Sequence, residues 1–341
     1  MKVIELDNVE KHFTMLNRHE GISGAIRDLF SNDYRTLKAV DGISMAIEAG
    51  ETVGFVGPNG AGKSTTIKMM TGVLEPTRGT IRVNGLTPHR DRKKHMRNIG
   101  VIFGQRTQLW WELPVVESFR LLREIYQIDR EAYDRTIELF VELVRLDELF
   151  STPVRFLSLG QRMVCDIAAA FLHCPSVIFL DEPTIGLDVS VKSKIRSLIK
   201  TLNETNATTI ILTTHDVNDI ETLCRRIIVI DKGRIIFDGD IQRVSKLFGA
   251  YRTLKVDLSE SHAGVTEDQL RSRIQAKFAC NGAVAVDRVD GGWMALTIDQ
   301  DAIGLLEILS YVLAEFRVKD VKIEEIATES IIRRIYEGAL R

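Results

Sequence analysis

The sequence has few cysteines, no long apolar run and almost no net charge. The four cysteines are Cys165, Cys174, Cys224 and Cys280. They form neither a Cys-x-x-Cys pair nor a Cys/His cluster, which excludes a disulfide framework and predicts reduced thiols in a cytosolic protein. No apolar stretch reaches the roughly 18–20 residues that a membrane-spanning helix needs. Residues 1–7 do not read as a signal peptide, so we expect a soluble chain that can still dock on a membrane protein.

The weak charge bias limits the kinds of partner. The net charge is −2 and the pI is about 6.4, which excludes the broad basic surface of a nucleic-acid-binding protein. Of the 341 residues, 45% are hydrophobic and 27% are charged, as in ordinary globular proteins that bury a sizeable core. This length predicts two domains.

A glycine-rich loop occupies residues 57–65, where the sequence reads GPNGAGKST. It follows an apolar run at 52–56 that predicts a buried parallel strand, and it precedes a helix-forming segment. The loop contains Gly57, Asn59, Gly60, Gly62 and Thr65. The glycines let successive backbone N–H groups point at an anion, and the helix presents its positive N-terminus to the same place. The loop is therefore predicted to cradle phosphate.

The backbone of this loop would not hold a triphosphate alone, because a helix terminus contributes only about 0.3–1 kcal/mol per charge. The next two residues supply what is missing. Lys63 can reach the β- and γ-phosphates, and the Ser64 hydroxyl can ligate Mg²⁺. The complete GxxxxGK[ST] pattern, in its strand-to-helix context, thus predicts a triphosphate site with Mg²⁺.

Two carboxylates follow another apolar strand, predicted at 177–180. A strand that apolar is buried on both faces, so Asp181 and Glu182 emerge at its C-terminal end, where doubly wound sheets bind ligands. Asp181 suits Mg²⁺, and Glu182 suits the base that polarises an attacking water. The tight loop after them ends at Asp188.

Two further strands end in polar residues at the same expected edge. The strand at 99–103 leads to Gln105, which can reach a metal or the attacking water. The strand at 208–214 leads to His215, which can donate a hydrogen bond to a γ-phosphate oxygen.

The segment 157–162 reads LSLGQR and precedes a helix-forming run. Ser158 and Gly160 therefore stand at a helix N-terminus, where an anion can bind. Ser-x-Gly before a helix is usually only a cap, so this motif depends on the others for its interpretation.

Aromatic and amphipathic segments leave two interpretations open. Phe13 can stack on adenine, or it can be a core residue. Trp110 and Trp111 can support the helices that follow, or line a pocket for a partner. The insert at 14–37 holds an apolar stripe at helical spacing, over 22–30, which packs on its own domain or lies against a membrane partner or the bilayer.

The remaining pattern divides the chain near residue 245. Residues 116–149 have a helical pattern and predict an inserted lobe, and a hairpin at 227–237 closes the first domain. Beyond it, the predicted order β-α-β-β-α-β is that of the ferredoxin-like fold, followed by a last helix at 329–340. We expect a regulatory or dimerisation module there, because it carries no visible catalytic constellation.

In this order, the motifs resemble the ATP-binding subunit of ABC transporters. They are Phe13, GPNGAGKST, Gln105, LSLGQ, VIFLDEP, Asp188 and His215, within residues 1–245. The resemblance implies an α/β P-loop NTPase with a RecA-like core, an antiparallel β subdomain and a helical lobe at 106–165, followed by the α+β domain at 250–341. It also implies an ATPase that uses ATP and Mg²⁺.

The resemblance assigns roles within one chain. Phe13 resembles the adenine-stacking aromatic, and Gln105 resembles the Q-loop residue at the metal and the attacking water. Asp181 and Glu182 resemble the metal-binding and catalytic acids, and His215 resembles the switch histidine.

Other roles implied by the resemblance belong to a second copy of the chain. In a head-to-tail dimer, Ser158, Gly160 and Gln161 would contact the nucleotide held by the partner, and Asp188 resembles the D-loop aspartate. The family's usual LSGGQ has Gly where this chain has Leu159, but Ser158 and Gly160 are intact, so we expect a competent site.

The insert, the GQRTQLWWELP stretch and LSLGQR resemble a bacterial subgroup of ATPases that export drugs, antibiotics, sodium or polysaccharides. We therefore expect a homodimer at the cytoplasmic face of the cell membrane, attached through integral-membrane permease subunits.

Two rival functions remain. One is an importer ATPase, since some importers append C-terminal regulatory domains. The other is a soluble ABC ATPase of translation or DNA repair, whose usual second cassette or long coiled-coil insert this chain lacks.

Overall fold

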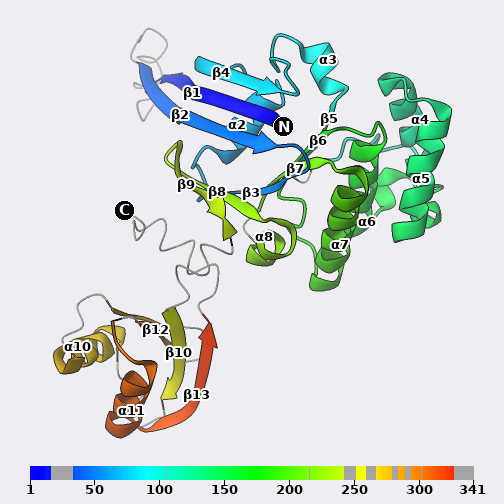
Figure 1. Cartoon of the computed structure of the whole chain (residues 1–341). Coiled ribbons are helices and arrows are strands. Elements are labelled where there is room, and N and C mark those ends of the chain that lie inside the picture. The colour runs from blue at the N-terminus through cyan, green and yellow to red at the C-terminus, as the bar shows by residue number, and fades with distance from the viewer. Residues whose placement is uncertain are drawn as a thin grey trace, which may run out of the picture. The chain divides into compact units, whose positions relative to one another are not determined.

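The computed structural model describes most of the chain (Figure 1). The described residues are 1–16, 34–104, 106–214, 216–241, 251–258, 266–278, 283–288, 293–300 and 302–325. The chain divides into two compact units, Met1–Gly239 and Asp240–Arg341. In the part of the chain that is described, no helix combines the length and the apolar character of a membrane span.

A six-stranded sheet with the order β5-β6-β7-β3-β8-β9 forms the centre of the first unit (Figure 1). Its strands are β3 (Thr52–Val56), β5 (Ile99–Phe103), β6 (Val177–Asp181), β7 (Thr209–Thr213), β8 (Arg226–Asp231) and β9 (Arg234–Asp240). Neighbours from β5 to β8 pair in parallel. Strands β6 and β7 are buried along almost their whole length, which is why apolar and β-branched residues fill them. The strands predicted at 52–56 and 99–103 are confirmed.

The parallel pairing decides where the candidate site lies, because the carboxyl ends of parallel strands meet at one edge of a sheet. Strand β3 ends at Val56, directly before the glycine-rich loop, and β6 ends at Asp181. Strand β7 ends at Thr213, which lies opposite Asp181 in the register. The edge therefore collects the loop, the carboxylates and a threonine hydroxyl.

A three-stranded antiparallel sheet with the order β2-β1-β4 packs on the central sheet. Its strands are β1 (Lys2–Leu16), β2 (Tyr34–Glu48) and β4 (Arg78–Val83). Helix α2 (Lys63–Met70) begins at the end of the glycine-rich loop. One hydrophobic core joins both sheets and α2, since Ile4, Ile43, Phe55 and Ile67 are all buried in it.

The hairpin of β1 and β2 is longer than the sequence predicts. The insert predicted at 14–37 is strand at both ends, because β1 continues to Leu16 and pairs there with Tyr34, the first residue of β2. This extension comes from backbone pairing across the hairpin, which a local hydrophobic pattern does not reveal. The amphipathic stripe predicted at 22–30 lies outside the described residues.

A helical lobe follows β5. It contains α4 (Val115–Tyr126), α5 (Arg130–Val144) and two short 3-10 turns at Leu146–Leu149 and Val154–Phe156, and it leads into α6 (Leu159–Phe171). Phe119 and Phe140 are fully buried, and the Phe140 ring centroid lies 6.3 Å from that of Phe171 in α6. The apolar faces of the lobe therefore pack on α6. The described helices of this unit also include α3 (Arg92–Met96), α7 (Val189–Asn206) and α8 (Val217–Leu223).

The second unit contains a four-stranded antiparallel sheet with the order β11-β12-β10-β13. Its elements are β10 (Tyr251–Leu258), α10 (Glu267–Phe278), β11 (Val284–Arg288), β12 (Trp293–Asp299), α11 (Leu305–Glu315) and β13 (Val318–Glu325), which is the predicted order β-α-β-β-α-β. Leu254, Leu296 and Ile308 are fully buried in its core. The ferredoxin-like assignment and the domain boundary at 245–250 stay predictions, and the predicted last helix at 329–340 lies outside the described residues.

Candidate nucleotide site

Lys63 begins helix α2 and folds back over its own loop. Its Nζ donates hydrogen bonds to the carbonyl oxygens of Gly57, at 2.6 Å, and Pro58, at 3.1 Å. The residue is only 6% exposed. Burial lowers the pKa of its ammonium group, and the charges of Glu182 and Asp181 oppose that shift. The ammonium group therefore lies within electrostatic reach of both carboxylates, where a phosphate chain can bind.

Close backbone approach requires glycine at two positions of the loop. Gly62 has a φ of 108°, in the left-handed region, and a Cβ there would lie 2.5 Å from the carbonyl oxygen of Ala39. A Cβ on Gly57 would lie 2.4 Å from the carbonyl oxygen of Ile230. The backbones of β2 and β8 thus shape the phosphate loop.

The remaining predicted loop contacts are accessible to a ligand. Asn59, Gly60 and Ser64 are exposed, and Thr65 is half-buried. Because Ser64 lies in the first turn of α2, its hydroxyl is available beside the positive end of that helix. A hydroxyl in this position suits a metal ion that bridges the protein and a phosphate.

Asp181 and Glu182 are both tied to Thr213 at the end of β7. The Asp181 carboxylate accepts a hydrogen bond of 2.5 Å from the Thr213 hydroxyl. Glu182 has a left-handed backbone with a φ of 54°, and its N–H donates to the Thr213 carbonyl oxygen at 3.0 Å. Such a conformation costs a non-glycine residue about 1–3 kcal/mol and is concentrated at functional sites. Sequence analysis missed Thr213, although it lies at the end of a strand that leads to His215.

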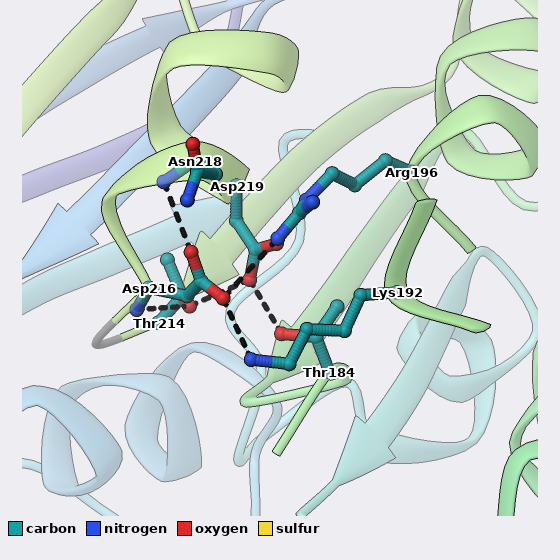
Figure 2. A network of polar contacts seen from close by, with 7 residues as sticks. All are labelled: Thr184, Lys192, Arg196, Thr214, Asp216, Asn218 and Asp219. Atoms are coloured by element: carbon teal, nitrogen blue, oxygen red, sulfur yellow. Dashed lines mark hydrogen bonds and ion pairs between the residues drawn. The ribbon is translucent and has the colours of Figure 1, made fainter. Parts of the chain in front are cut away.

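Gln105 and His215 lie outside the described residues, but residues beside both are placed. Gly104 donates its N–H to the carbonyl oxygen of Asp181 at 2.9 Å. This bond brings the chain that leaves β5 to the carboxylate pair. Thr214 and Asp216, on either side of His215, take part in the polar network of Figure 2.

The centre of this network is the fully buried carboxylate of Asp219 in α8 (Figure 2). It accepts hydrogen bonds from the hydroxyls of Thr184 and Thr214, at 2.5 and 2.7 Å. It also accepts a hydrogen bond of 2.6 Å from Nε of Arg196 in α7. Thr184 comes two residues after Glu182, so Asp219 joins the loop after the carboxylates to the segment before His215.

The exposed side of the same network is built on Asp216. Its carboxylate accepts hydrogen bonds from Nζ of Lys192, at 2.7 Å, and from Nη2 of Arg196, at 3.2 Å (Figure 2). It also accepts one from the N–H of Asn218 at 3.0 Å and so caps α8. Helix α7 therefore contributes two cations that hold the residues around His215.

The start of α6 is capped by Ser158. The Ser158 hydroxyl accepts the N–H of Gln161 at 3.2 Å, and the Gln161 side chain accepts the N–H of Ser158 at 2.9 Å. Both residues are exposed, whereas Gly160 is buried. A Cβ on Gly160 would lie 2.7 Å from Cγ1 of Val191, and Val191 donates its N–H to the capping carboxylate of Asp188. Gly160 thus also serves the packing of α6 on the start of α7.

Phe13 lies on the hairpin that approaches the phosphate loop. It is half-buried, it pairs with Leu37 of β2, and Nζ of Lys11 lies 5.4 Å from its ring centroid. Leu37 comes two residues before Ala39, whose carbonyl oxygen approaches Gly62. The ring is therefore on the correct part of the fold for adenine, and adenine stacking stays a prediction.

A buried carboxylate in α6 was missed by sequence analysis. Asp166 is 5% exposed, and its Oδ1 accepts hydrogen bonds from the Thr107 hydroxyl, at 2.8 Å, and the Gln108 N–H, at 3.1 Å. Burial raises its pKa to about 6, although these two hydrogen bonds and the Arg162 charge lower it. Its partners lie 58 or 59 positions away, so no local pattern could reveal the contact.

Comparison with known proteins identifies the family. A sequence profile described as "ABC transporter" matches residues 40–185. The ABC transporter ATP-binding protein NatA of Bacillus subtilis is 32% identical over 213 residues, which are 62% of this chain and 86% of NatA. The chain belongs to the ATP-binding family of ABC transporters.

Two further relatives of this ABC ATPase have names that give opposite directions of transport. The methionine import ATP-binding protein MetN of Latilactobacillus sakei is 30% identical over 255 residues, which are 72% of this chain and 74% of MetN. The Nod factor export ATP-binding protein I of Neorhizobium galegae is 34% identical over 206 residues, which are 60% of this chain and 59% of that relative.

A solved ATP-binding cassette has a similar fold. It is a dimer in a post-hydrolysis state with ADP and Pi, and the match has a TM-score of 0.56 and 26% identity over 70% of this chain and 98% of the cassette. The ABC ATPase is therefore the ATP-hydrolysing subunit of a transporter, and the predicted P-loop NTPase fold is confirmed.

Lys63→Ala should weaken ATP binding by about 100-fold, because it removes a charge-assisted contact to phosphate worth roughly 1.5–3 kcal/mol. Isothermal titration calorimetry of the purified chain measures the dissociation constant. Lys68→Ala is the matched control, since Lys68 is an exposed lysine of the same helix. Equal affinities of the two variants would contradict the assignment of the loop.

Arg196→Met should lower the free energy of unfolding by about 3–5 kcal/mol, because it leaves the buried Asp219 carboxylate without its cation. Lys192→Met, one turn earlier on α7, removes one of the two cations of the more exposed Asp216 and should cost clearly less. Urea unfolding of both variants gives the comparison. A loss no larger in Arg196→Met than in Lys192→Met would show that the buried pair does not stabilise this region.

Asp166→Asn should remove a pH dependence of stability. The Asp166 pKa is about 6 in the folded chain against an ordinary 3.8, so the folded state holds the proton more tightly than the unfolded state. The free energy of unfolding of the wild type should therefore fall between pH 4 and pH 7 by on the order of 2–3 kcal/mol relative to the variant. Urea unfolding at four pH values measures this difference, and a difference that does not change with pH would disprove the expectation.

Proposed function

We propose that two copies of this chain close around two ATP molecules and that ATP hydrolysis drives export of a substrate through a separate integral-membrane permease. One observation carries the proposal. Phe55 near the end of β3 and Asp181 at the end of β6 both pair with Thr213 of β7, so the phosphate loop after β3 and the two acids meet at one edge of the sheet within a single chain. Ser158, by contrast, is exposed at the N-terminus of α6 and is available to a second copy.

The residues of one chain would bind and cleave the triphosphate. The loop N–H groups and Lys63 would hold the β- and γ-phosphates. Ser64 and Asp181 are oxygen donors of the kind that Mg²⁺ takes, and with Gln105 they would hold the ion, which neutralises phosphate charge when bound. Glu182, half-buried at the end of β6, would orient the attacking water and accept its proton.

The second copy would complete the site. Ser158, Gly160 and Gln161 begin a helix whose positive end would face the γ-phosphate held by the partner. ATP can act as a switch only if it binds the closed dimer more tightly than the open one, by several kcal/mol. Contacts at the start of α6 that exist only in the dimer would supply that difference.

Two further residues would contact the nucleotide, and a third would respond to the dimer contact. Phe13 would stack on adenine, and His215 would donate a hydrogen bond to the γ-phosphate and lose it after cleavage. Asp188 caps α7 through the N–H of Val191, and Gly160 of α6 packs against Val191. A displacement of α6 on dimer formation would therefore reach Asp188.

Export is the favoured direction because the LSLGQR and GQRTQLWWELP segments resemble exporter ATPases and because one relative carries export in its name. Import is a second candidate, since the MetN match covers the larger share of the chain, 72% against 60%. In either case we place the chain at the cytoplasmic face of the membrane, held there by its permease. The second unit would serve regulation or dimerisation.

Purification of the full chain from membranes tests the transport role. A polytopic membrane protein in the same complex supports transport, and a solute-binding protein that stimulates the ATPase of that complex indicates import rather than export. A chain that is purified with ribosomes or DNA-repair proteins, without a permease, would contradict both.

Glu182→Gln should bind ATP with wild-type affinity, hydrolyse it roughly 10²–10⁴-fold more slowly and accumulate as an ATP-bound dimer, because it lacks the general base. A phosphate-release assay and light scattering after gel filtration measure the two effects. Glu204→Gln, at an exposed position of α7, is the control. Wild-type turnover in Glu182→Gln would show that Glu182 is not the general base. A monomer that encloses ATP would rule out the proposed dimer.

A further inference from the structure

The segment after β5, residues 104–111, is bonded to one side of helix α6. Asp166 accepts hydrogen bonds from the Thr107 hydroxyl and the Gln108 N–H, and its carbonyl oxygen accepts another from Nε2 of Gln108 at 2.9 Å. One turn earlier, the guanidinium of Arg162 lies 5.3 Å from the ring centroid of Trp111. Two residues four positions apart on α6 therefore contact the same segment.

These contacts lie on the side of α6 that begins with Ser158. Positions 158, 162 and 166 follow a four-residue spacing, which places them one above the other on a helix. At the other end of the segment, Gly104 is bonded to the Asp181 carbonyl oxygen. The segment after β5 is thus bonded to Asp181 through Gly104 and to α6 through Thr107 and Gln108.

Asp166 is the central group of these contacts between α6 and the segment after β5. A single oxygen, Oδ1, accepts both the hydroxyl and the N–H, so it is this one atom that fixes two consecutive residues. Asp166 is almost fully buried and its two partners are half-buried, so an N–H left without a partner there carries a cost. Arg162 lies near enough for its charge to support the carboxylate.

We propose that Asp166 is a positioning residue for the ATP-dependent dimer: it fixes Thr107 and Gln108 to α6, so that the segment after β5, which is bonded to Asp181 through Gly104, moves together with Ser158. This inference rests on the proposed function, because Ser158 matters in this way only if it meets the nucleotide of a second copy. Asp166 itself does not touch the nucleotide. Its loss should therefore affect dimer formation and leave ATP binding to one chain unchanged.

The test uses the full chain with Glu182→Gln as the parent, so that ATP hydrolysis does not dissociate the dimer. In this parent, Asp166→Ala should weaken ATP-dependent dimerisation about tenfold, because it removes two partly buried hydrogen bonds. Asp166→Asn should restore it, because the remaining amide oxygen can accept both donors. The affinity of each monomer for a fluorescent ATP analogue should stay within about twofold of the parent. Light scattering over a concentration series gives the dimer dissociation constant.

Asp129→Ala is the matched control. Asp129 also accepts a backbone N–H in the helical lobe, where it caps α5, and it has no hydrogen bond to the described residues of the segment after β5. It should leave dimerisation unchanged. A purely structural role of Asp166 would lower stability in Asp166→Ala without changing the dimer constant, and that result would overturn the inference.

Two outcomes separate this inference from the function on which it rests. If the parent stays monomeric with ATP, the proposed function fails, and this inference fails with it. If the parent dimerises and Asp166→Ala dimerises equally well, only the role of Asp166 is disproved. Should Asp166→Ala not fold, Thr107→Val removes one donor in a similar shape and should weaken dimerisation about threefold. An unchanged dimer constant in that variant would overturn the inference equally.

Discussion

The burial of the Lys63 ammonium group is the constraint on which the rest of the site depends. A buried cation is stable only when oxygen atoms and opposite charges surround it. The carbonyl oxygens of Gly57 and Pro58 accept hydrogen bonds from it, and Glu182 and Asp181 supply negative charge. The loop must therefore bend tightly around the side chain, and β6 must end close by. A triphosphate that enters this place finds its cation already positioned.

Threonine hydroxyls hold Asp181 at the end of β6 and Asp219 in α8 in place. Thr213 donates to Asp181, while Thr184 and Thr214 donate to Asp219. Neutral donors can fix a carboxylate and leave much of its charge uncompensated, unlike a direct ion pair. Asp219 differs, because Arg196 also forms an ion pair with its buried carboxylate. This division fits an edge where some carboxylates support the structure and others face a ligand.

In the proposed function, helix α6 would connect these local arrangements to the dimer contact. It begins at the exposed Ser158, packs on α7 through Gly160 and Val191, and carries Asp166 in its interior. The helix therefore contacts both the first turn of α7 and the segment that follows β5. A helix with contacts at its start and at its middle can transmit a small displacement between them.

Local residue patterns were enough to predict the strands at 52–56 and 99–103, the phosphate loop and the acids at the end of β6, because buried parallel strands and glycine-rich loops have strong local signatures. The order of elements in the second unit followed from the same kind of pattern. The sequence did not predict the roles of Thr213, Asp166 and Asp219, or the full length of the β1–β2 hairpin. Each of these depends on a partner from another element: Asp166 meets residues 58 or 59 positions away, and Leu16 pairs with Tyr34 across the hairpin. Periodicity and motif spacing report only how a segment meets water or its own neighbours, so contacts between distant segments were decided by the tertiary structure.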